Sequence, residues 1–146
     1  MLNPDFKDIL SILSAHDVKF MLVGAYAMAF HGYPRTTGDI DIFIAPTIDN
    51  AKKVYRALTE FGAPLEQITP EEFAKPGTVY QIGVAPRRID ILNRISGVSF
   101  EEGFSDKNTV TVEGLQIHIL SKAKVIANKK ATGRPKDLLD IDHLSA

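Results

Sequence analysis

The chain contains no cysteine among its 146 residues, so disulfide bridges and thiolate metal sites are excluded. It also lacks an excess of charge, because 17 basic and 18 acidic residues leave a formal net charge of −1. A nearly neutral chain is not expected to bind nucleic acid over a wide surface, which leaves room only for a local basic patch. No apolar run approaches the roughly 18 residues of a membrane span. A cysteine-free chain also fits a reducing compartment.

The size and makeup of the chain indicate one domain. Its 146 residues are close to the usual length of a single domain, and 45% of them are hydrophobic, which is enough for one sizeable core. The first ten residues, MLNPDFKDIL, lack the basic start and the long apolar segment of a secretory signal. No internal repeat, low-complexity tract or linker is visible. We therefore expect a cytoplasmic protein, without a membrane partner, that folds as one domain over residues 1–146.

Local patterns predict an α/β (α+β) fold with a mixed sheet and helices packed mainly on one side. Helical spacing of apolar residues predicts helices over 5–15, 25–30, 47–60, 121–131 and 136–144, and one short helical turn that begins at Thr69. Short apolar runs predict strands over 19–23, 39–44, 79–84, 88–92, 109–112 and 115–120. Because their connections are short, the last four strands are expected to form two antiparallel hairpins.

Two acidic residues interrupt the apolar strand over 39–44. Side chains alternate along a strand, so Asp39 and Asp41 point to one face, and the isoleucines at 40, 42 and 44 point to the other. Two like charges about 6–7 Å apart on one face repel each other. Either the pair protects a solvent-facing strand edge, or a divalent cation is shared between the two carboxylates.

Two further features fit such a cation. Gly24 lies between a strand and a helix, where glycine lets the backbone approach a ligand and the N–H groups of the helix start attract phosphate. The simpler interpretation is a tight turn. Asp90 is a single acid in the strand over 88–92 and is either exposed, paired with a nearby arginine, or the third carboxylate of a two-metal site.

A basic stretch lies near the end of the chain. Residues 126–137, IANKKATGRPKD, carry four basic side chains before Asp137, and Asp140 follows. The stretch is either a solvated helix surface that ends at a glycine, or a source of cations that meet a triphosphate.

In this order, a glycine turn, a helix, a strand with paired acids and a later strand with a third acid, the chain resembles the minimal nucleotidyltransferases of the DNA polymerase beta-like superfamily. Val23-Gly24-Ala25 is followed by thirteen residues, 26–38, and then by the Asp-x-Asp strand. The string over 35–41, RTTGDID, is similar to the Arg-x-Thr-x-Asp-hydrophobic-Asp pattern of a bacterial and archaeal group of uncharacterised nucleotidyltransferases. The stretch from Lys129 to Asp140 is similar to the closing motifs of the abortive-infection toxin branch. The resemblance spans Leu22 to Leu144.

The resemblance implies a role for each matching residue. Asp39, Asp41 and Asp90 would hold Mg²⁺ or Mn²⁺. Gly24 and the Ala25 N–H would touch phosphate, with Arg35 as a further phosphate contact. Lys129 would be the basic catalytic residue, Lys130 its near alternative, and Asp137 the later catalytic acid. The family usually has Gly or Ser where this chain has Ala25, which keeps the backbone donor but lacks a hydroxyl.

The expected activity is transfer of a nucleoside monophosphate from a nucleoside triphosphate, such as ATP, to a hydroxyl acceptor, with release of pyrophosphate. A protein side chain, a tRNA 3′ end and a small molecule all stay open as acceptors, and a partner protein or a homodimer could supply the acceptor surface. The alternative is a catalytically weak nucleotide-binding module, such as one half of a toxin–antitoxin pair. A nuclease-like metal site is a third, weaker idea.

Overall fold

The computed structural model describes residues 2–33, 38–84 and 87–145 of the chain. The helices are α1 (Pro4–Ala15), α2 (Gly24–Phe30), α3 (Ile48–Phe61), the 3₁₀ helix η1 (Pro70–Ala74), α4 (Phe100–Ser105), α5 (Lys122–Thr132) and α6 (Pro135–Ser145). The strands are β1 (Phe20–Val23), β2 (Ile40–Ile44), β3 (Val79–Ile82), β4 (Ile89–Leu92), β5 (Asn108–Val112) and β6 (Leu115–Ile119). The α+β class and the mixed sheet predicted from the sequence are confirmed.

The six strands form one sheet in the order β3-β4-β2-β1-β6-β5. The β2–β4 and β1–β6 pairs are parallel, and the other neighbours are antiparallel. The predicted hairpins, β3–β4 and β5–β6, are both present and form the two edges of the sheet. The sequence-distant strands β2 and β4 therefore become central neighbours, which places the Asp-x-Asp strand beside the strand of the third acid.

The hydrophobic core lies around the central strands. The isoleucines at 40, 42 and 44 of β2 are fully buried, as the alternating pattern predicts. Phe43 is also buried, on the face that carries Asp41, where its ring meets that of Phe100 in α4 at 5.2 Å between centroids. Both faces of β2 are thus covered, which gives the acids at its beginning a rigid support.

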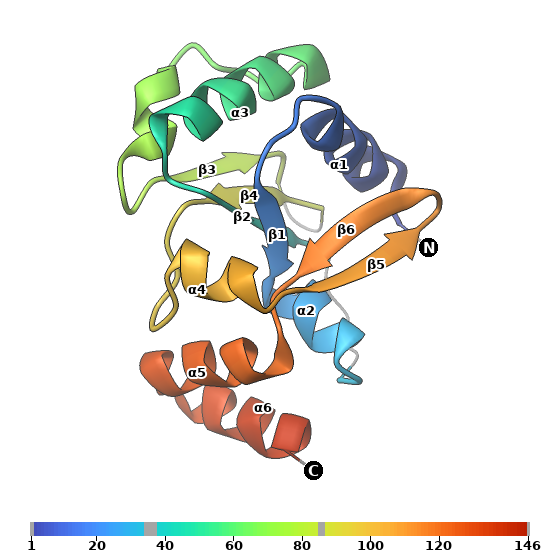
Figure 1. Cartoon of the computed structure of the whole chain (residues 1–146), viewed down its shortest axis with the longest axis vertical. Helices are drawn as coiled ribbons and strands as arrows, with labels where there is room; N and C mark the ends of the chain where they lie inside the picture. The colour runs from blue at the N-terminus through green and yellow to red at the C-terminus, as the bar shows by residue number, and fades with distance from the viewer. Residues whose placement is uncertain (1, 34–37, 85–86, 146) are drawn as a thin grey trace.

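The helices gather at two ends of the molecule. Figure 1 shows α1 and α3 side by side at one end, the sheet in the middle, and the α5–α6 pair at the other end. Helix α5 begins after Ser121, whose side chain accepts a hydrogen bond from the Lys124 N–H, and it ends at Gly133 with φ of +63°. Both ends agree with the sequence prediction. In the described part of the chain, no helix is long and apolar enough to cross a membrane.

Helix α4 is the element that the sequence analysis did not predict. It is only six residues long and contains Gly103, so it lacks a clear helical periodicity. Its signal was a capping box, in which Ser99 accepts from the Glu102 N–H and the Glu102 side chain accepts from the Ser99 N–H. Residues 99–102 therefore mark a helix start that apolar spacing alone could not reveal.

Candidate active site

The three acids predicted to act together lie together. Asp41 of β2 is the register partner of Asp90 of β4, and Asp39 directly precedes β2. The parallel pairing is extended beyond β4 by a hydrogen bond from the Ile40 N–H to the Arg88 carbonyl, 2.9 Å. The predicted neighbourhood of Asp39, Asp41 and Asp90 is therefore present, although Asp39 lies just outside the strand to which the sequence pattern assigned it.

Gly24 meets the same acids from β1. It is the first residue of α2, it has φ of +65°, and its predecessor Val23 is the register partner of Asp41. A Cβ atom at position 24 would lie 2.1 Å from Asp41 Oδ2. The backbone of the turn and the Asp41 carboxylate are thus so close that only glycine fits between them, which is a stronger requirement than a tight turn alone imposes.

The electrostatics of Asp41 reflect its crowded surroundings. Burial, the charge of Asp90, a side-chain hydrogen bond to Asp90 and the charge of Asp39 raise the pKa of Asp41 to about 6, while Arg88 lowers it. Two carboxylates can share a hydrogen bond only when one of them carries a proton. A cation at this position would remove both the repulsion and the need for that proton.

Arg88 supplies the positive charge in this structure. Its guanidinium binds both oxygens of Asp90, with Nε 2.8 Å from Oδ1 and Nη2 3.1 Å from Oδ2. Nη2 also lies 3.3 Å from Asp39 Oδ2, and the Arg88 backbone N–H donates to Asp39 Oδ1 at 3.2 Å. The pairing of Asp90 with a nearby arginine, one of the alternatives that the sequence left open, is therefore present.

The carboxylate oxygens of Asp39, Asp41 and Asp90 are the ligands that a hard divalent cation prefers. In this structure the Asp39 and Asp90 side chains are oriented by their contacts with Arg88. Among the residues that the structure describes, no three His, Cys, Asp or Glu side chains are grouped so as to hold a metal ion. The carboxylates of Asp39 and Asp90 instead contact the Arg88 guanidinium.

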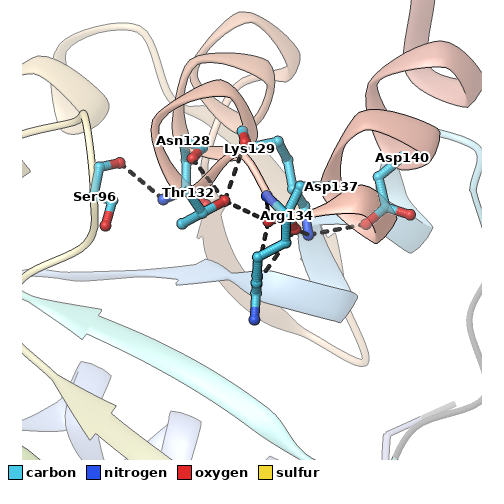
Figure 2. Close-up of polar contacts among 7 residues, drawn as sticks. All are labelled: Ser96, Asn128, Lys129, Thr132, Arg134, Asp137 and Asp140. Atoms are coloured by element: carbon cyan, nitrogen blue, oxygen red, sulfur yellow. Dashed lines mark hydrogen bonds and ion pairs between the residues drawn. The ribbon is translucent and has the colours of Figure 1, made fainter.

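A second polar cluster joins α5 to α6 (Figure 2). Lys129 Nζ lies 3.0 Å from Asp140 Oδ2 and 3.6 Å from Asp137 Oδ1, and the Lys129 side chain is only 12% exposed. Both acids are buried. The predicted basic residue Lys129 is thus held by two acids of α6, of which only Asp137 had been assigned a role in the predicted site.

Asp137 is bound on all sides by its own helical pair. Its Oδ2 accepts from Thr132 Oγ1 at 2.6 Å and from the Arg134 N–H and Nε at 3.1 and 2.8 Å. The Arg134 guanidinium, with the Thr132 hydroxyl, holds the pKa of Asp137 well below its usual range, against the effect of burial. Asp137 can therefore act on the site through Lys129 and Arg134, whereas its own oxygens are occupied within the cluster.

The helical pair is attached to the sheet by the loop that follows β4. Asn128 Nδ2 donates to the Ser96 carbonyl at 2.8 Å (Figure 2). A Cβ atom on Gly97 would lie 2.6 Å from Ala131 Cβ, so the loop and α5 are in close backbone contact. Because the same loop continues from the strand of Asp90, it connects the acidic cluster to the basic one.

A cleft of about 440 Å³ lies between the two clusters. Its lining residues come from the β1–α2 turn, β2, the end of β4, α5 and the start of α6; they are Val23, Gly24, Ala25, Asp41, Leu92, Ile95, Asn128, Lys129, Arg134 and Lys136. The cleft is thus lined by one carboxylate, three cations and four apolar side chains. This combination suits a substrate that carries both a polyanion and a flat apolar group.

The structure places the remaining predicted residues differently. Lys130 is exposed and does not line this cleft in the described part of the chain, whereas Lys136 and Arg134 do. The sequence indicated Arg134 and Lys136 only as members of the basic stretch. It could not show which cations of that stretch line the cleft, because this depends on how α5 and α6 pack. Leu92, Ile95 and Asn128 carried no signal at all. Arg35 lies outside the described residues.

A larger cleft, of about 880 Å³, lies at the opposite end of β1 and β2, around Lys19, Ala45 and Phe100. It contains none of the three acids and no residue of α5 or α6. We assign the candidate site to the smaller cleft because only there do the carboxylate, the glycine turn and the basic residues converge.

Comparison with known proteins supports this fold assignment. No family model and no curated protein sequence matches the chain. Among solved structures, a protein of Thermotoga maritima described as a nucleotidyltransferase aligns with a TM-score of 0.63 at 17% identity, over 99% of this chain and 93% of its own. The lincosamide antibiotic adenylyltransferase LnuA, bound to lincomycin, aligns with a TM-score of 0.63 at 16% identity, over 100% and 98%.

A third structure is an antigenic nucleotidyltransferase-like protein from Paracoccidioides brasiliensis. It aligns with a TM-score of 0.55 at 16% identity, over 96% of this chain and 74% of its own. At such identities the likeness concerns the fold. The chain therefore has the fold of these nucleotidyltransferases, and it spans nearly the whole length of the first two.

Proposed function

We propose that this chain, which has a nucleotidyltransferase fold, is a metal-dependent nucleotidyltransferase that moves a nucleoside monophosphate from a nucleoside triphosphate to a hydroxyl acceptor. The observation that carries the proposal is the position of Asp41, which is the register partner of Asp90 and lines the same cleft as Lys129, Arg134 and Lys136. Neighbouring acids in a cleft that also contains three cations fit a triphosphate that is bound together with a divalent cation.

Asp39, Asp41 and Asp90 are the residues that would hold Mg²⁺ or Mn²⁺. When bound, such an ion would offset the charge of the triphosphate and lower the pKa of the acceptor hydroxyl. The raised pKa of Asp41 supports this role, because a carboxylate crowded by burial and by Asp90 gains most from a cation.

The chain's own groups would position the reactants. The Gly24–Ala25 backbone would lie along the phosphates, since a side chain at position 24 would collide with Asp41. Arg134 and Lys136 would offset the charge of the pyrophosphate, and Leu92 with Ile95 would support the base. The ion pairs with Asp137 and Asp140 would hold the Lys129 side chain in place at the cleft.

The reaction itself exchanges one phosphorus–oxygen bond for another. The acceptor oxygen forms a bond to the α-phosphorus, the bond from the α-phosphorus to the bridging oxygen breaks, and pyrophosphate leaves with that electron pair. The hydroxyl proton passes to the Asp90 carboxylate and then to solvent. This role requires that Asp90 be released from Arg88, which binds both of its oxygens here.

The acceptor class is the open part of the proposal. LnuA, which has the same fold over 98% of its length, is an adenylyltransferase with a bound lincosamide. That correspondence supports a small hydroxyl compound as an acceptor. A protein side chain or a tRNA 3′ end would need a further binding surface.

Label transfer tests the proposal. The purified chain is incubated with Mg²⁺ or Mn²⁺, each α-³²P nucleoside triphosphate, and in turn small hydroxyl compounds, total RNA and total protein. We expect label in one acceptor pool and equimolar pyrophosphate, both lost in Asp41→Asn. Nucleotide binding without transfer to any pool would instead favour the catalytically weak module, and transfer that survives Asp41→Asn would remove Asp41 from the mechanism.

A further inference from the structure

We propose that Arg88 is an internal counter-ion that competes with the divalent cation for Asp39 and Asp90, so that metal loading displaces its guanidinium. The inference rests on the proposed function, because it concerns the same three acids. Beyond that function, Arg88 would set the affinity of the site for the metal.

The contacts of Arg88 account for most of the available oxygens. Both oxygens of Asp90 and both oxygens of Asp39 accept hydrogen bonds or ion pairs from Arg88, at 2.8 to 3.3 Å. Among the contacts of the described residues, none joins Asp41 to the guanidinium. One guanidinium therefore already contacts two of the three carboxylates that would share a metal.

A guanidinium and a divalent cation cannot occupy this position together without cost. Both would draw on the same lone pairs, and two positive charges within a few Å repel each other strongly in a partly buried site. Metal binding then requires the guanidinium to leave Asp90, or the metal must bind more weakly.

The Arg88 side chain has room to change its rotamer. It directly precedes β4, and about one third of its side chain is exposed, so its guanidinium can swing into solvent without opening the core. Its backbone can stay in place, because the Arg88 carbonyl accepts from the Ile40 N–H within the strand pairing. The exchange therefore needs only side-chain rotation, which is fast compared with turnover.

The neighbouring Arg87 offers a matched control. It carries the same charge, it is exposed, and no described contact joins it to the three acids. Removal of either arginine changes the net charge equally, so long-range electrostatics affects both variants alike. A difference between them isolates the direct contact of Arg88 with the carboxylates.

Mn²⁺ binding to the full chain, measured by calorimetry without nucleotide, tests the inference. We expect Arg88→Ala to bind Mn²⁺ about tenfold more tightly or better than wild type, because charge-assisted hydrogen bonds no longer oppose the metal. Arg87→Ala should stay within about twofold of wild type, since it removes only a distant charge. Arg88→Lys, which restores the charge without the bidentate fork, should fall between them.

A second readout separates this role from a purely structural one. Without metal, Arg88→Ala should melt at a lower temperature than wild type, and saturating Mn²⁺ should stabilise it by more than it stabilises wild type. Arg88→Gln, similar in length and able to hydrogen bond, keeps the test available if the alanine variant does not fold. Equal or weaker Mn²⁺ affinity in these variants, with binding still lost in Asp41→Asn, would overturn the inference alone. Failure of every variant to bind Mn²⁺ would overturn the proposed function as well.

Discussion

Asp41 of β2 and Asp90 of β4 are direct register partners on parallel strands, and burial together with the neighbouring Asp90 raises the pKa of Asp41 to about 6. A folded chain gains nothing from two adjacent acids of this kind unless a proton or a cation lies between them. The charge of Asp41 therefore affects both the stability of the metal-free protein and the chemistry of the cleft.

Asp41→Asn should make the metal-free protein more stable at pH 7.5. Because the folded pKa of Asp41, about 6, lies above its ordinary value of 3.8, the folded state binds the proton more tightly, and stability from this group falls as the pH rises from about 4 to about 6. The gain in the variant should be on the order of 2 kcal/mol at pH 7.5 and should vanish near pH 3.5. Urea unfolding in EDTA at both pH values measures it.

The exposed acid Asp8 of α1 provides the control for that experiment. Asp8→Asn removes the same charge far from the cleft, and its stability difference should be small and nearly independent of pH. A loss of stability in Asp41→Asn at pH 7.5 would contradict the crowding of the acids.

Gly24→Ala should disable the site, and Gly32→Ala should not. Both glycines have positive φ, so both variants carry the backbone strain of an L residue in that region, roughly 1 kcal/mol. At position 24 the new Cβ meets Asp41 Oδ2, whereas no atom of the described residues lies within 4 Å of the Cβ at position 32. Isothermal titration with Mn²⁺ and ATP should show at least a tenfold weaker affinity for Gly24→Ala alone. Similar affinities in the two variants would argue against close contact of the turn with Asp41.

Lys136→Ala should weaken nucleotide binding, and Lys130→Ala should leave it nearly unchanged. Lys136 lines the cleft, while Lys130 is exposed on α5 and does not line it in the described residues. Loss of one cation beside a triphosphate is expected to raise the dissociation constant about tenfold. Fluorescence titration with a labelled ATP analogue and Mg²⁺ compares the two. A larger effect at Lys130 would restore the sequence-based assignment of that residue.

Asp137→Asn should destabilise the protein without acting on the acids of the sheet. The Asp137 side chain is fully buried and joins Thr132 and Arg134 across the α5–α6 turn. Breaking this charged cluster should cost about 2–4 kcal/mol at neutral pH. Because the folded pKa is lowered, the stabilisation is present above about pH 4 and is lost as the pH falls below it.

Chemical denaturation of Asp137→Asn at pH 7 and pH 3 measures this dependence. Asp142→Asn, at an exposed position of the same helix, is the control and should change stability by less than about 0.5 kcal/mol. An equal effect of the two substitutions would show that Asp137 has no special part in the helical pair.

Much of the fold followed from local sequence. The alternation of isoleucine with aspartate in β2 predicted both the strand and the face of Asp41, because the pleat allows only one arrangement of alternating side chains. Ser121 and Gly133 marked the ends of α5 for reasons that are equally local. Helix α4 was not predicted from the sequence, because so short a helix is stabilised by contacts between residues distant in sequence, such as Phe100 and Phe43.

The site divides in the same way. By itself the sequence determined which residues carry charge and which strand face or turn they occupy, since these follow from dihedral preferences and side-chain periodicity. Only the tertiary structure decided that Asp90 lies beside Asp41, that Arg88 contacts both Asp39 and Asp90, and that Lys136 but not Lys130 lines the cleft among the described residues. The reason is physical: strand order and helix rotation depend on long-range packing, and the direction of a long charged side chain depends on the partners that packing brings to it.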